Sequence, residues 1–143
     1  MFESMTKDEI YDFISNISRT GKLATVCKDG RPHCMPVWCC FEDEHILFMT
    51  MNTTVKARNI ARDKRVSITF DNESFPFDFV SIEGDAEVLD VTQEERLAIA
   101  TRIAARYVPE GKAEDFGRRN AVPEELVIRI TPRKYISAKN LAH

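Results

Sequence analysis

The chain has 143 residues, of which 43% are hydrophobic and 30% are charged, and its formal net charge at pH 7 is −3. A chain of this size can fold as one domain that buries roughly two thirds of its unfolded surface, and its slightly acidic balance argues against a non-specific nucleic-acid-binding protein. Residues 1–10 are too polar for a secretory signal and no apolar run approaches the ~18 residues of a membrane span, so we expect a cytoplasmic protein without a membrane or nucleic-acid partner.

The N-terminal segment, residues 1–19, is predicted to contain a helix. Thr6 and Glu9 have the spacing of a capping box, in which each satisfies a backbone N–H near the helix start. The apolar residues that follow repeat at helical spacing, and we expect their common face to cover an open end of the core. These residues are Ile10, Phe13, Ile14 and Ile17.

Two strand-like runs follow, at residues 22–28 and 33–41. The Asp29-Gly30 pair between them is a strong hairpin signal. Pro36 lies inside the second run, which predicts an edge strand or a bulge because proline cannot donate to the sheet. Cys39 and Cys40 are adjacent, so a strand directs them to opposite faces, and no cysteine spacing matches a zinc motif. We therefore expect ordinary thiols and no metal site.

The segment from His45 to Arg65 carries the strongest functional signal. An unbroken apolar run predicts a strand, His45–Met51, that is buried on both faces. Asn52, Thr53 and Thr54 then supply capping groups for a short helix over residues 55–63. Free N–H groups and the positive end of a helix dipole favour an anion there, and a lysine in that turn opposes the dipole.

This pattern predicts a phosphate site at the start of the short helix; the alternative is a solvated helix face. The pattern places Ala57, Ile60 and Ala61 on the buried face and Arg58 with Arg62 on another. No Walker loop or dinucleotide-type glycine fingerprint occurs, and the chain has only five glycines, which excludes a P-loop enzyme or a Rossmann dehydrogenase.

The second half of the chain adds strands at residues 65–71, 79–83 and 86–91, with Gly84-Asp85 separating the last two. Thr92 and Glu95 predict a capped helix over residues 92–107, and residues 109–120 read as a loop with a short helix. Residues 126–130 form a final strand that leads into residues 134–137. Six or seven short strands with few helices favour a closed or half-open antiparallel barrel in a single domain. Its segments are the N-terminal helix (1–19), the main strands with the phosphate turn (20–91), a helical segment (92–120) and the final strands (121–143).

Several segments together resemble a known family. They are, in chain order, GKLATVCKDGRPHCMPVWC, VKARNIARDKRVSI, PFDFVSIEG, ATRIAARYV and FGRRNAVPEELVIRI. Over about residues 20–133 the chain resembles the flavin-binding split-barrel proteins of the pyridoxamine 5′-phosphate oxidase superfamily, and within it the deazaflavin (F420) branch. The resemblance implies a mainly β fold with flanking helices, a six-stranded antiparallel split β-barrel, and a homodimer with cofactor sites at the subunit interface.

The resemblance also implies which residues bind the cofactor. The phosphate would be held at Thr50, Lys56 and Asn59, with Arg58 and Arg62 as further candidates. The ring would lie along Met35, Pro36, Val37 and Trp38, although Trp38 alone could be a core residue. Phe75, Phe77 and Phe79 could form a wall from the partner subunit or an ordinary dimer core, and Arg118 and Arg119 could reach an acidic tail or be solvated. The methionines in Met49-Thr50-Met51-Asn52 depart from the smaller residues of the family.

The function implied by the resemblance is hydride transfer between F420 and a small organic substrate, in which the cofactor carries the chemistry. The alternatives are an FMN-dependent oxidoreductase or FMN-binding protein of the same fold, a non-catalytic carrier of a flavin, haem or tetrapyrrole, and a structural dimer. No catalytic acid or base is predicted from the sequence. Tyr107 could be a proton donor, but a packing role is favoured.

Overall fold

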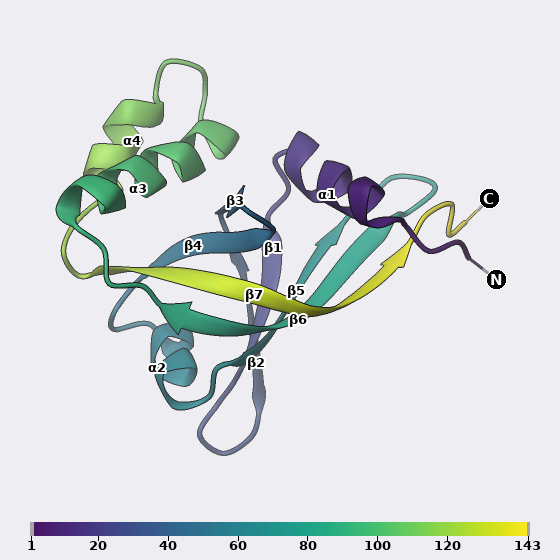
Figure 1. Cartoon of the computed structure of the whole chain (residues 1–143), viewed down its shortest axis with the longest axis horizontal. Helices are drawn as coiled ribbons and strands as arrows, with labels where there is room; N and C mark the ends of the chain where they lie inside the picture. The colour runs from purple at the N-terminus through teal and green to yellow at the C-terminus, as the bar shows by residue number, and fades with distance from the viewer. Residues whose placement is uncertain (1, 143) are drawn as a thin grey trace.

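Seven strands form one curled antiparallel sheet that is flanked by helices (Figure 1). The computed structural model describes residues 2–142. The order across the sheet is β2-β1-β5-β6-β7-β4-β3, so the two strands at its edges are β2 and β3. The mainly β split-barrel fold with flanking helices is confirmed. The strands are β1 (Gly21–Val26), β2 (Pro32–Val37), β3 (Cys39–Glu42), β4 (His45–Met51), β5 (Arg65–Asp71), β6 (Phe79–Val88) and β7 (Glu125–Ala138).

The second predicted strand, residues 33–41, is two strands in the structure. The strand is interrupted at Trp38, and β2 and β3 lie at opposite edges of the sheet. The sheet within residues 2–142 has seven strands, which agrees with the six or seven expected from the residues and is one more than the six implied by the resemblance. The predicted hairpin is confirmed, since β2 pairs antiparallel with β1, and Pro36 lies on an edge strand as expected.

The predicted break at Gly84-Asp85 is wrong, because β6 is continuous and has only a register shift between Glu83 and Gly84. A Cβ atom at Gly84 would lie 2.6 Å from the Thr131 carbonyl oxygen. The glycine therefore allows a close approach of β6 to β7 instead of ending a strand. The final strand β7 is likewise continuous where two pieces were expected.

Four helices surround the described sheet: α1 (Lys7–Asn16), α2 (Val55–Arg62), α3 (Gln93–Tyr107) and α4 (Ala113–Asn120). The capping boxes predicted at Thr6 and Thr92 are both present, and the Thr54 side chain caps α2. In Figure 1, α3 and α4 lie together at one end of the sheet, whereas α2 lies on the opposite side of β4 from them. No helix within residues 2–142 is long and apolar enough to cross a membrane.

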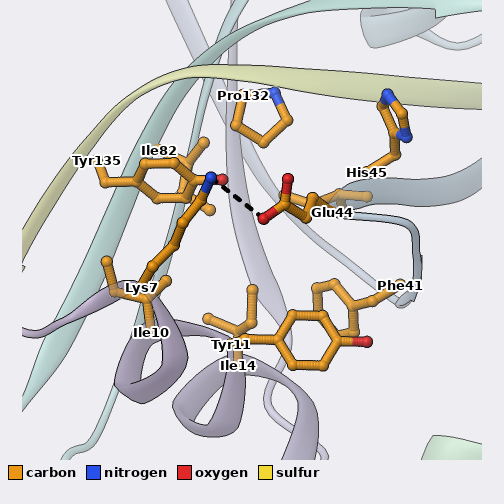
Figure 2. Close-up of a pocket in the computed structure, with 11 residues that line it drawn as sticks. Lys7, Ile10, Tyr11, Ile14, Phe41, Glu44, His45, Ile82, Pro132 and Tyr135 are labelled. Atoms are coloured by element: carbon orange, nitrogen blue, oxygen red, sulfur yellow. Dashed lines mark ion pairs between the residues drawn. The ribbon is translucent and has the colours of Figure 1, made fainter.

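The main core fills the inside of the curled sheet, and α1 closes it with Ile10 and Ile14. Beneath α1 remains a hollow of about 30 Å³, which has room for about one water molecule. An ion pair of 3.1 Å between Lys7 and Glu44 crosses it (Figure 2). Strand β4 is buried on both faces as predicted, because Phe48 enters the main core and Leu47 packs beneath α3.

Candidate functional site

A pocket of about 300 Å³ lies among the β2–β3 bend, β4, β7 and the helices α2, α3 and α4. This volume is at the lower end of the range for small-molecule sites. The pocket unites four of the residues predicted from the sequence: three from the expected ring-binding segment and one from the expected phosphate turn. The lining residues are Pro36, Val37, Trp38, Met49, Lys56, Ala100, Ile103, Asn120 and Glu125.

Trp38 provides an exposed aromatic surface in this pocket. Its side chain is 40% exposed, and its ring stacks on Tyr107 with centroids 5.0 Å apart and planes 9° apart. The Tyr107 hydroxyl donates to the Arg19 carbonyl at 2.8 Å and accepts from the Cys39 N–H at 3.2 Å. Burial raises the pKa of Tyr107 to about 12. Tyr107 therefore orients Trp38, which supports the packing role over that of a proton donor.

The start of α2 offers hydrogen-bond donors toward the pocket. The Thr54 side chain accepts from the Ala57 N–H at 3.2 Å, and the Thr54 carbonyl accepts from the Arg58 N–H at 3.1 Å. Within residues 2–142, the backbone amides of Val55 and Lys56 are the first-turn donors left without a helical partner. The Lys56 side chain makes no hydrogen bond or ion pair with any of these residues and lies in the pocket. This turn is open to an anion.

Other residues that were predicted to bind the phosphate make hydrogen bonds to neighbouring residues of the protein. Thr50 is buried, and its hydroxyl lies 2.8 Å from that of Thr54. Asn59 is also buried, and its side-chain N–H donates to the Thr25 hydroxyl at 3.0 Å. Arg62 donates to the Val26 carbonyl at 2.7 Å and to the Asn59 amide oxygen at 2.9 Å. These hydrogen bonds connect α2 to β1 and position the turn at the start of α2.

The predicted buried face of α2 needs one correction. Ala57 and Ile60 are buried as expected, but Ala61 is exposed and Asn59 takes its place. Arg58 is exposed and makes no hydrogen bond or ion pair with residues 2–142. Met35, with 45% of its side chain exposed, lies outside the pocket lining.

Glu125 and Asn120 line the pocket, although no sequence pattern predicted either of them as site residues. Glu125 begins β7 directly opposite Met51 of β4, and its side chain is half-buried. Burial raises the pKa of the Glu125 carboxyl, while the positive charge of Lys56 acts in the opposite direction. A glutamate that precedes an apolar strand is an ordinary feature, so only the fold shows that it faces Lys56.

The remaining sequence candidates lie outside this pocket. Phe75 and Phe77 are 68% and 44% exposed and contact each other edge to face. Arg118 pairs with Asp115, and Arg119 lies over the Phe116 ring. Within residues 2–142 no group of three or more His, Cys, Asp or Glu side chains could hold a metal ion. The four cysteines are free: Cys27, Cys34, Cys39 and Cys40.

Comparisons with known proteins agree with this architecture. The family profile of pyridoxamine 5′-phosphate oxidase matches residues 6–138. A conserved hypothetical protein of known structure from Mycobacterium tuberculosis, Rv2991, is 30% identical over 95% of this chain and 86% of its own, with a TM-score of 0.80. An F420 reductase is 21% identical, with a TM-score of 0.69 over 87% of this chain and 94% of its own.

A haem storage protein from Vibrio cholerae, HutZ, is 19% identical, with a TM-score of 0.73 over 92% of this chain and 94% of its own. At such identities the F420 reductase and HutZ show a shared fold only. A search of curated proteins found no match.

Proposed function

The chain belongs to the pyridoxamine 5′-phosphate oxidase family, and we propose that it is an oxidoreductase that transfers a hydride between bound F420 and a small organic substrate. One observation carries the proposal: a single pocket joins the aromatic face of Trp38 to the cationic start of α2. A cofactor with a flat ring and a phosphate needs both features, at two ends of one site. The likeness to a protein described as an F420 reductase supports this choice.

The residues of the pocket suit such a cofactor. Lys56 and the first amides of α2 would hold the phosphate, because a helix start and an ammonium group both favour an anion. Val37, Trp38 and Ile103 would provide an apolar wall for the ring. The reduced deazaflavin supplies the hydride itself, so the protein has to bind, orient and shield its reactants.

We propose F420 over FMN because two cations of the α2 region remain available to a longer anionic tail. Arg58 and Lys64 are exposed and make no hydrogen bond or ion pair with residues 2–142. Arg62 and Arg65 are less available to a tail, since Arg62 bonds to β1 and Arg65 is paired with Asp63. An FMN-dependent oxidoreductase or FMN-binding protein is the alternative.

Parallel titrations test this proposal. Trp38 is the only tryptophan of the chain and lies in the pocket, so its fluorescence should fall as the cofactor binds. We expect F420 to bind more tightly than FMN, and added salt to weaken F420 more, because the exposed tail contacts are screened. Tight FMN binding without measurable F420 binding would establish the alternative.

A carrier function is less well supported by the pocket than a redox function. HutZ, which shares the fold, is described as a haem storage protein. Histidine, cysteine, methionine and tyrosine are the axial ligands of haem iron in proteins, and of these the pocket lining contains only Met49. A haem absorption band in protein purified from haem-supplied cells would count against the oxidoreductase.

We also propose that the protein works as a homodimer. The outer face of β1, β5, β6 and β7 has cross-strand pairs of small or apolar residues, Ala24 with Ser67 and Ser81 with Ile136. Ile136 is 41% exposed. The same face also carries the Lys22–Asp71 and Glu83–Lys134 ion pairs, and exposed phenylalanines lie in the β5–β6 loop. A second copy related by a two-fold axis would cover the same surface on both subunits.

A further inference from the structure

The candidate cofactor pocket contains two titratable side chains, Lys56 and Glu125, which have opposite charges. Its other lining residues are apolar or have side chains that do not titrate. Lys56 is already assigned to the phosphate. The Glu125 carboxylate makes no hydrogen bond or ion pair with residues 2–142, although it is half-buried. A carboxylate in this position is costly to keep charged.

We propose that Glu125 is the proton-holding residue of this site: it takes up a proton when the anionic cofactor binds and can deliver that proton to the substrate. The inference rests on the proposed function. It assigns the acid that the sequence did not reveal, on a side chain that shares the pocket with Trp38.

The surroundings of Glu125 explain why cofactor binding should protonate it. From α2, the positive charge of Lys56 lowers the pKa of the carboxyl and opposes the effect of burial. From α3, Arg96 donates to the Glu125 backbone carbonyl at 3.1 Å and to the Gln93 side chain at 2.7 Å. The β4 partner Met51 and Asn120 of α4 carry no charge, and the neighbouring Glu124 is exposed.

A cofactor phosphate beside Lys56 would offset the positive charge that lowers the pKa of Glu125, while burial would continue to raise it. The pKa of Glu125 should then be higher in the complex than in the free protein. The complex binds more protons than the free protein between these two pKa values, so affinity should fall as the pH rises through that interval. Each unit of pKa difference corresponds to about a tenfold change in affinity.

The same proton serves the reaction. Reduction of a polarised double bond requires a hydride at one atom and a proton at the other. A reduced deazaflavin held by Trp38 and Lys56 would supply the hydride, with its electron pair, to carbon and would itself be oxidised. The proton leaves Glu125, which becomes a carboxylate and is reprotonated from water. General acid groups of this kind work best when their pKa is raised toward neutrality.

Isothermal titration calorimetry with F420 at pH 7, in two buffers of different ionisation enthalpy, measures the proton uptake. We expect uptake of up to one proton per site for the wild type and loss of that uptake in Glu125→Gln. This variant should bind up to about tenfold more tightly at pH 8, because it carries no charge to neutralise. Glu124→Gln is the matched control, since it removes the same charge from an exposed neighbour, and it should behave as the wild type.

Two outcomes would overturn the inference. Unchanged proton uptake in Glu125→Gln would remove Glu125 from this role while leaving the proposed function intact. Absence of F420 binding to the wild type would instead overturn the proposed function and this inference with it. Glu125→Asp, which retains a carboxyl, should retain a pH-dependent affinity, and it serves as a second test if the glutamine variant does not fold.

Discussion

Lys56 and Arg62 belong to the same short helix, but the structure gives the two cations different surroundings. The Lys56 ammonium lies in the pocket without a hydrogen bond among residues 2–142. The Arg62 guanidinium is bonded to the Val26 carbonyl and to Asn59. Sequence spacing places Lys56 in the first turn and Arg62 in the last turn of one short helix, but it does not show which of the two cations will bond to another part of the chain.

Replacing Lys56 by alanine should weaken cofactor binding and leave the fold intact. A hydrogen bond to a charged group contributes about 1.5 to 3 kcal/mol, so the affinity for F420 should fall roughly ten- to hundredfold. The unliganded protein should lose little stability, because alanine favours the helix and removes a cation that opposes the dipole. Fluorescence titration of Trp38 and a melt of the cofactor-free protein measure the two effects. Parent-like binding, or an unfolded variant, would refute the phosphate-turn assignment.

Replacing Arg62 by alanine should lower the stability of the protein more than its affinity for the cofactor. The change removes the hydrogen bonds of 2.7 Å to the Val26 carbonyl and 2.9 Å to Asn59. We expect the free energy of unfolding to fall by about 1–2 kcal/mol, whereas F420 affinity at a temperature well below the melt should change less than in Lys56→Ala. Arg58→Ala is the matched control, since Arg58 makes no such hydrogen bond. This variant should have the same free energy of unfolding as the wild type. Chemical denaturation of all three proteins decides between these roles.

At the scale of elements, local signals were sufficient for helices and hairpins but not for the course of the barrel strands. Capping boxes at Thr6 and Thr92 predicted two helix starts correctly, because both partners lie within four residues of each other. The run at residues 33–41 contains no glycine, and Pro36 predicts an edge strand or a bulge, so no local signal places the end of the strand at Trp38. The break follows from closure of the sheet, which places β2 and β3 at opposite edges.

Helices α3 and α4 approach each other closely at Gly117. A Cβ atom there would lie 2.1 Å from the Thr101 Oγ1 and 2.9 Å from the Thr101 Cα. Gly→Ala in a helix normally adds up to about 1 kcal/mol of stability, but here we expect a net loss of about 1–3 kcal/mol because the helices must separate. Combination with Thr101→Ala should restore part of this loss. A melting temperature above that of the parent would contradict the close approach.

The N-terminal helix α1 makes a pH-sensitive contact with Lys139, the residue that follows β7. The Lys139 ammonium donates to Glu9 at 2.6 Å. Together with the Thr6 N–H it lowers the pKa of Glu9 to about 2. Because the folded-state pKa lies below the unfolded value, Glu9 contributes stability above the ordinary pKa of a glutamate, and this contribution is lost as the pH falls toward 2.

Glu9→Gln should therefore melt below the parent at pH 7, and the difference should disappear near pH 2. Asp12→Asn is a suitable control, because Asp12 lies on the same helix and makes no hydrogen bond or ion pair with residues 2–142. Thermal melts at pH 7, 4 and 2 measure the effect. A difference between Glu9→Gln and the parent that is independent of pH would show that the carboxylate charge is not involved.

For the whole molecule, the sequence supplied two sides of the candidate pocket and the fold supplied the others. Trp38 and Lys56 are separated by 18 positions and were selected for different reasons, Trp38 from the family resemblance and Lys56 also from its place at a helix start. Ile103, Asn120 and Glu125 join them only because α3, α4 and the start of β7 converge there. These long-range neighbours carry no local pattern, so a single sequence cannot indicate them.

Assembly can be tested on the outer face of the sheet. Ser81 lies in the middle of that face, opposite Thr69 on one side and Ile136 on the other, and the Thr69 hydroxyl donates to it at 2.9 Å. An arginine at position 81 would point outward, where a monomer can solvate it but a two-fold interface would bring two of these charges together. We expect Ser81→Arg to sediment as a folded monomer at micromolar concentration, whereas the parent should sediment as a dimer.

Glu110→Arg, in the exposed loop between α3 and α4, controls for added positive charge and should remain dimeric. A monomeric parent would remove the basis for a shared interface, and a dimeric Ser81→Arg would place the interface on another surface.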